Sequence, residues 1–325
     1  MKKVAISMTV FAVLAGCGGG GESGPSTELD SRPSIAMTTA NYEVAGKEVM
    51  SGTSNVGTLA DFSGFLTGAE INRGVTFPQF VQMKYALVGK TARQPAYFSG
   101  VTITETEPCT GGGSVTVSGN MNNENNVTQG DSFTLSANNC REDGTTINGV
   151  MSMRVLSVSG NVDVYPYAVS LEASTTDFRA TSGTTSYQTS GSLTLRVLET
   201  NFNNSDLSVT IPSMVSSVSA GAKTETVRYV NYKVDTSVRG STVSMTISGG
   251  LNVPSLGGNL VTVQTLQPFV STTSYPTSGL ATATTAMGGK MRISAASGNR
   301  VLIELDSTND ETYEASKFVL WNEVF

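Results

Sequence analysis

The chain has 325 residues, with 26 acidic and 20 basic side chains, a formal net charge of −6 and no histidine. The absence of histidine excludes Ser-His-Asp and Cys-His catalytic systems and every histidine-based metal site. Because the charge is acidic and no Lys/Arg cluster occurs, we expect no nucleic-acid partner.

The first seventeen residues have the pattern of an export signal. Lys2 and Lys3 are followed by a mostly apolar run, Val4 to Leu14, that is shorter than the ~20 residues needed to span a bilayer. The string Leu14-Ala15-Gly16-Cys17 then resembles the lipobox of bacterial lipoproteins. The resemblance implies removal of residues 1–16 as a signal peptide and attachment of lipid, palmitate included, to the new N-terminal Cys17. The alternative is an ordinary secretory signal with a chance cysteine.

Residue 18 bears on which bacterial membrane would hold the lipid anchor. Gly18, and not the Asp associated with inner-membrane retention, follows Cys17, so the resemblance favours a lipid anchor in the outer membrane. It leaves open whether the protein faces the periplasm or the cell surface. Residues 17–37 are rich in Gly, Ser and Pro, a composition typical of a flexible tether.

Residues 38–95 are expected to form a small helical region. Thr76–Gly89 has a capping threonine, a proline in the first turn and a terminal glycine, with apolar residues on one face. A weaker helix is predicted from about Asn41 to Met50. Such a region could cover the apolar face of a sheet, which we prefer to a partner-binding role.

From about residue 96 onward the apolar residues alternate with Ser, Thr or Arg. The clearest alternating segments are residues 115–117, 133–135, 151–155, 169–171, 193–197, 243–247 and 301–305. Alternation indicates antiparallel strands with one buried face, and turn pairs such as Asn148-Gly149 separate them. The sequence therefore predicts a mainly β fold, either one antiparallel meander sheet or tandem β modules.

Internal matches suggest that the β region contains repeats. Asn139-Cys140-Arg141 aligns with Asn231-Tyr232-Lys233, and residues 185–191 recur as 273–279. The implied repeat unit is around 80–90 residues, which is too long for a short-repeat solenoid. We therefore divide the region into β module 1 (96–190), β module 2 (191–278) and a C-terminal half-module (279–325).

Cys109 and Cys140 are the other two cysteines. An isolated pair in an exported protein is expected to form a structural disulfide, since a redox-active pair would favour C-x-x-C spacing. No catalytic site residue is predicted, because nucleophile and phosphate-loop motifs are missing. A carboxylate-based hydrolase is the remaining enzyme alternative, although no spacing marks a carboxylate pair.

Two segments partly match calcium-binding loops. The candidate ligands are Asn120, Asn122, Glu124 and Asp131 in the first segment and Asp306, Asp310 and Glu314 in the second. Both segments lack the glycine at loop position 6 and are short of carboxylates at key positions. We favour polar hairpin turns, so no metal and no cofactor is expected.

These observations favour a non-enzymatic outer-membrane lipoprotein acting as a structural or binding module. Its partner could be a protein, a glycan or a lipid. One alternative is a carrier of lipid or another apolar ligand, on a half-open curved sheet lined by Met151, Met153, Val155, Met245 and Ile247. Another is a surface adhesin, which could use the aromatic clusters Tyr165/Tyr167, Tyr229/Tyr232 and Phe318/Trp321/Phe325.

Overall fold

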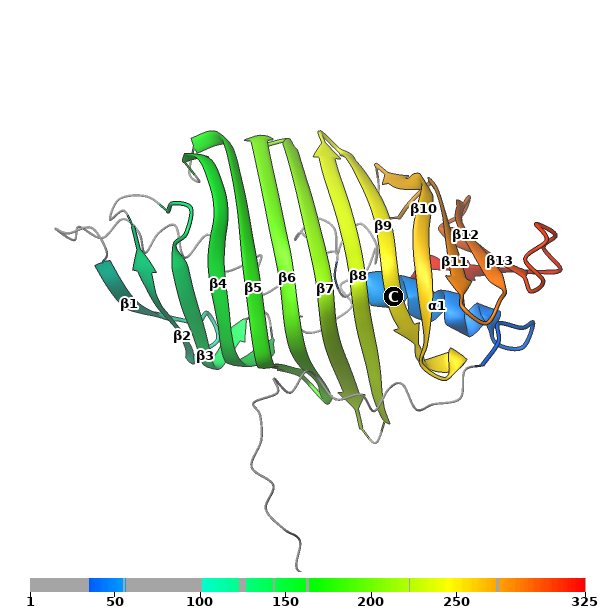
Figure 1. Ribbon diagram of the computed structural model, residues 1–325, viewed down its shortest axis with the longest axis horizontal. Helices are drawn as coiled ribbons and strands as arrows, with labels where there is room; N and C mark the ends of the chain where they lie inside the picture. The colour runs from blue at the N-terminus through cyan, green and yellow to red at the C-terminus, as the bar shows by residue number, and fades with distance from the viewer. Residues whose placement is uncertain are drawn as a thin grey trace, which may run out of the picture.

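The computed structural model describes residues 35–54, 56, 101–122, 127–142, 144–161, 164–221, 223–272 and 275–324. The predicted Thr76–Gly89 helix and Cys17 lie outside these residues. Fourteen strands form one sheet in which each strand pairs antiparallel with its sequence neighbours (Figure 1). This confirms the predicted mainly β fold and, of the two architectures, the meander.

The strands and helices have the following bounds. The strands are β1 (Val101–Pro108), β2 (Ser114–Met121), β3 (Ser132–Glu142), β4 (Thr145–Asn161), β5 (Val164–Ser182), β6 (Thr185–Asn201), β7 (Asn204–Ala220), β8 (Lys223–Arg239), β9 (Thr242–Val253), β10 (Asn259–Ser271), β11 (Ser278–Thr285), β12 (Lys290–Ala296), β13 (Arg300–Asp306) and β14 (Ala315–Leu320). The helices are α1 (Tyr42–Ser54), a 3-10 turn η2 (Pro254–Leu256) and the short α4 (Trp321–Val324).

The alternation seen in the sequence sorts side chains onto the two faces of the sheet. In β5, Leu171 and Ala173 are buried while the intervening Glu172 is exposed. The same pattern recurs in the neighbouring strands, so one face carries the apolar core and the other carries mostly Ser, Thr and charged residues. We call these the inner and the outer face.

A line of β-bulges crosses the sheet. Register shifts occur between every neighbouring pair of strands from β3 to β11 except β7 and β8. Most of these bulges insert one residue into one strand, so buried positions on that strand fall three apart instead of two. Tyr229 and Tyr232 both lie on the inner face for this reason, as do Ala137 and Cys140.

One of the internal sequence matches corresponds to two bulges with the same backbone conformation. Asn139 and Asn231, aligned in sequence, both adopt a φ of 46° inside a bulge, a left-handed conformation that asparagine tolerates well. Gly249 lies against the Asn231 bulge, where a β-carbon would approach Tyr232 Cα to 2.6 Å. Asparagine and glycine at these positions therefore serve the bulge geometry.

The sheet is continuous through the expected module boundary at residues 190/191. Ser190 and Gly191 are successive residues of β6, and both pair with β7. The second expected boundary, at 278/279, falls at the start of β11. The two internal copies, where they correspond, are thus segments of one sheet.

Helix α1 packs against the inner face near the C-terminal end of the sheet (Figure 1). It extends the helix predicted for residues 41–50 to Ser54. Its buried side chains include Ala45, Val49 and Met50. Glu48 accepts hydrogen bonds from the backbone N–H and the hydroxyl of Ser255, at 2.9 and 2.7 Å, which ties α1 to η2.

Candidate functional site

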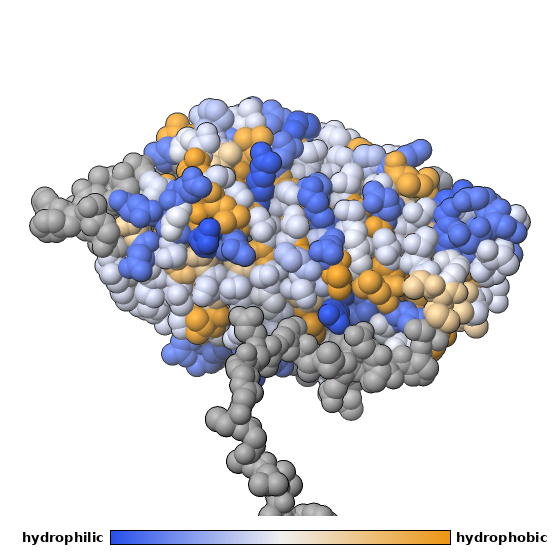
Figure 2. All heavy atoms as spheres, in the orientation of Figure 1, coloured by the Kyte–Doolittle hydropathy of each residue, from blue (hydrophilic) through white to orange (hydrophobic). Residues whose placement is uncertain are grey.

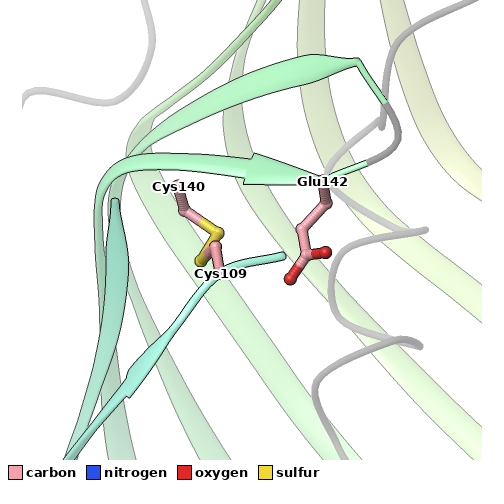
Figure 3. A group of neighbouring side chains, drawn as sticks. All are labelled: Cys109, Cys140 and Glu142. Carbon is pink, nitrogen blue, oxygen red and sulfur yellow. A yellow bond between two sulfur atoms is a disulfide. The ribbon is translucent and has the colours of Figure 1, made fainter. Parts of the chain in front are cut away.

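The predicted disulfide is present and joins the end of β1 to β3. Cys109 and Cys140 are bonded at 1.98 Å and both are buried (Figure 3). Glu142 lies beside them, and its Oε2 accepts a hydrogen bond of 2.9 Å from Thr110 Oγ1. Although the three ligand atoms lie within 4.8 Å of one another, sulfurs bonded to each other are not the thiolates that bind metals. In this state the group is a cross-link.

In the first calcium-loop candidate, Asp131 is fully buried and acts as an acceptor for the turn. Its carboxylate accepts hydrogen bonds from Asn122 N at 2.8 Å, Thr128 N at 2.7 Å and Thr128 Oγ1 at 3.1 Å. Asn120 is directed elsewhere, because its Oδ1 accepts from Thr102 Oγ1 at 3.0 Å. Glu124 lies outside the described residues. A cation at Asp131 would have to displace these donors.

The second candidate, between β13 and β14, is arranged similarly. Asp306 is fully buried and accepts from the backbone N–H groups of Asp310 at 3.1 Å and Glu311 at 2.8 Å. Glu314 accepts from both the N–H and the hydroxyl of Ser307. Hydrogen bonds from Thr312 lower the pKa of Asp310, and the Ser307 hydroxyl lowers the pKa of Glu314. These contacts support the polar-turn interpretation of both segments.

The residues suggested as the lining of an apolar pocket are core residues. Met151, Met153, Val155, Met245 and Ile247 are each at most 4% exposed and belong to one buried apolar cluster. Their side chains lie on the inner face of the sheet.

The aromatic clusters fall into buried and exposed classes. Tyr229 and Tyr232 are buried edge to face, with ring centroids 5.4 Å apart, and Trp321 is buried against Phe269 at 6.2 Å. In contrast, Phe318 is 49% exposed and Tyr165 is 46% exposed. Phe325 lies outside the described residues.

Two shallow troughs lie on the outer face, where Figure 2 shows polar residues interspersed with apolar patches. The first has a volume of about 420 Å³ and crosses β1 to β5. One wall is a register row of polar residues, and the other is a parallel row of hydroxyl residues. The first row is Thr102, Asn120, Ser132, Arg154 and Glu172, and the second is Ser118, Thr134, Ser152 and Ser174.

The floor of this first trough, which we call the hydroxyl trough, is backbone. Gly119, Phe133 and Met153 line it between the two rows, and their own side-chain positions belong to the inner face. A β-carbon at Gly119 would lie 2.8 Å from the Phe133 ring, so the ring takes the space that a larger residue would need.

Charged groups distinguish the two troughs. In the hydroxyl trough, Arg154 and Glu172 are opposite each other in register, yet no ion pair or hydrogen bond joins their side chains to any described residue. The second trough has about 390 Å³ and spans β6 to β9. Its carboxylates are already paired, Asp235 with Lys233 and Asp206 with Arg239, both at 2.7 Å.

The sequence did not predict the hydroxyl trough. Alternation predicts that Ser and Thr face solvent, but which of them become neighbours depends on the register of five strands. That register in turn depends on turn lengths and on the bulge between Ala137 and Cys140.

Searches against protein-family models, curated proteins and solved structures found no match to this chain. Among the described residues, none of the helices has the length and apolar character needed to cross a bilayer.

Proposed function

We propose that this protein is a non-enzymatic binding module, anchored by lipid in the bacterial outer membrane and displaying the outer face of its sheet. The observation that carries the proposal is the division of the sheet into two chemically different faces. Apolar side chains are packed into the inner face, while the two troughs described above are lined mostly by polar residues on the outer face.

The packing of the inner face favours a binding module over a carrier of apolar ligands. A carrier needs an apolar cavity of some hundreds of Å³. The five residues that would line it are buried with the rest of the core. The hydroxyl trough has a suitable volume, but its walls are polar.

The lipid anchor is tested by replacing one residue. The full chain expressed in a Gram-negative host should lack residues 1–16, carry acyl chains on Cys17 and fractionate with outer membranes at high salt. Cys17→Ser should remove the acyl mass and release the protein from membranes, because no thiol remains to accept lipid. Intact-mass spectrometry and membrane fractionation measure both effects.

Ser23→Ala, a change within the expected tether, is the control and should leave lipidation unchanged. A mature protein with an unmodified Cys17 thiol would refute the anchor. Stoichiometric lipid extracted from the Cys17→Ser protein, which has no covalent acyl chain, would refute the binding-module proposal in favour of a carrier.

A further inference from the structure

We infer that the hydroxyl trough binds a linear oligosaccharide that lies across the strands β1 to β5; this inference rests on the proposed binding function and names its ligand. The trough crosses four inter-strand spacings, so at about 4.8 Å each it is about 19 Å long. It is open along its length and about 420 Å³ in volume, which suits a short extended chain.

The spacing and type of the side chains carry the inference. Ser118, Thr134, Ser152 and Ser174 come from four successive strands and are directly opposed in register. Each hydroxyl can both donate and accept a hydrogen bond. A ladder of such groups at strand spacing can contact hydroxyls that recur along a polymer of sugar units.

Arg154 and Glu172 add two strong and different hydrogen-bonding groups in the facing row. Both side chains are exposed and have no ion pair within the described chain. An unpaired guanidinium donates to ring or hydroxyl oxygens and to carboxylates, whereas an unpaired carboxylate accepts from neighbouring hydroxyls. Placed opposite each other, they could engage adjacent units of one chain.

Other ligand classes fit the trough less well. Protein interfaces are centred on aromatic and other apolar anchors, and serine is depleted in them. A nucleic acid would require several cations for its phosphates, but the trough contains one arginine. Acyl chains would leave the polar walls without hydrogen-bond partners.

The short side chains also make the trough suitable for binding without rearrangement. Serine and threonine have few rotamers to lose, and their backbone is held in a hydrogen-bonded ladder on both sides. The entropy lost on ordering such a site is therefore small compared with that of a site built from long side chains.

Titration of the full-length lipoprotein in detergent tests the inference. The probes are linear tetrasaccharides: maltotetraose, N-acetylated chitotetraose and the acidic tetragalacturonate. At least one should bind with saturation, as measured by calorimetry and by saturation-transfer NMR. Ser152→Trp fills the trough and should weaken binding at least tenfold, while Ser248→Trp, on the same face in β9 and outside the trough, should not.

The charge variants separate neutral from acidic ligands. If tetragalacturonate binds best, Arg154→Gln should weaken it at least tenfold and Glu172→Gln should leave or improve it. If a neutral probe binds best, both variants should weaken it. The inference is overturned if no probe binds at millimolar concentration, or if Ser152→Trp binds as the unmodified chain does. Neither outcome affects membrane fractionation or acylation, so the proposed anchor is judged separately.

Discussion

The hydroxyl of Tyr232 on β8 is the first donor of a buried hydrogen-bond chain that ends on the backbone of α1. Thr53 Oγ1 lies 2.6 Å from it and donates its own proton to Val49 O at 2.9 Å. Since the threonine proton is used in that bond, Tyr232 must be the donor to Thr53. Burial raises the pKa of Tyr232 well above its ordinary value.

This arrangement predicts a specific loss of stability in alkaline solution. The unfolded chain releases the tyrosine proton above about pH 10, whereas the folded chain retains it. The stability is therefore complete below pH 10 and falls as the pH rises toward the folded pKa, by up to about 1.4 kcal/mol per pH unit for this group. Urea unfolding of Tyr232→Phe between pH 9 and 11 should show a shallower decline than the unmodified chain.

The same substitution should cost about 1 kcal/mol at neutral pH, since one buried hydrogen bond is lost. Tyr165→Phe serves as the matched control, because Tyr165 is 46% exposed and should change neither value. An identical alkaline decline in the Tyr232→Phe protein and the unmodified chain would rule out this role for the hydroxyl.

The burial of both tyrosines could not be predicted from the alternating pattern of the sequence. Residues 229 and 232 are three apart, and strict alternation would place them on opposite faces of a strand. The bulge at Asn231 brings both onto the inner face. The partner of Tyr232 comes from a helix 179 residues earlier, a separation that no local pattern encodes.

At the scale of elements, two glycines of α1, Gly46 and Gly52, lie where the helix contacts the sheet. A β-carbon at Gly46 would lie 2.9 Å from both Cδ1 and Cγ2 of Ile303 on β13. At Gly52, the carbonyl accepts a 3.0 Å hydrogen bond from the Tyr229 hydroxyl. Glycine lowers helix propensity by about 1 kcal/mol relative to alanine, so these positions favour close approach over intrinsic helicity.

Gly46→Leu should therefore destabilise the fold by about 1–3 kcal/mol, through overpacking against Ile303. Hydrogen exchange should accelerate in α1 and in the facing part of β13, and denaturant unfolding should shift to a lower midpoint. Val44→Leu is the control, because Val44 is 49% exposed on the same helix. Unchanged exchange in the Gly46→Leu protein would mean that the helix does not depend on this contact.

The positions of strands and helices could be predicted from the sequence more reliably than the pairing and contacts between them. The alternating segments correspond to strands, and the helix near residue 41 is present, because each depends on periodicity within a few residues. The bulges depend on pairing between strands, and the hydroxyl trough depends on five strands in register. The disulfide was predictable since only two cysteines remained.

For the whole molecule, an open sheet has two ends, and each is secured differently. At the C-terminal end, α1 and α4 approach each other, and Lys47 contacts Glu323 at 3.5 Å. At the other end, the Cys109–Cys140 bond joins β1 to β3 across β2. Edge strands are the parts of a sheet with least pairing, so a covalent link stabilises the one that lacks helical cover among the described residues.

Removing the bond with Cys109→Ser and Cys140→Ser should reduce the free energy of unfolding by about 3–4 kcal/mol in the chain-entropy model. Hydrogen exchange should accelerate most in β1 and β2, whereas β11 to β13 should change little. Treating the unmodified chain with a reductant should reproduce the double variant. Uniform acceleration across all strands would show instead that the bond stabilises the sheet as a whole.

The strictly sequential strand order also determines when each part of the molecule can be completed. Every strand pairs only with its neighbours in the chain, so the sheet can grow hairpin by hairpin from its N-terminal end, with short loops to close. Helix α1 is the exception, because it precedes the sheet while it contacts β8, β9, β12, β13, η2 and α4. The first described element in the chain is thus among the last that can pack in its final place. Until the C-terminal strands have formed, its apolar side chains lack the sheet surface that buries them; these are Ala45, Val49 and Met50.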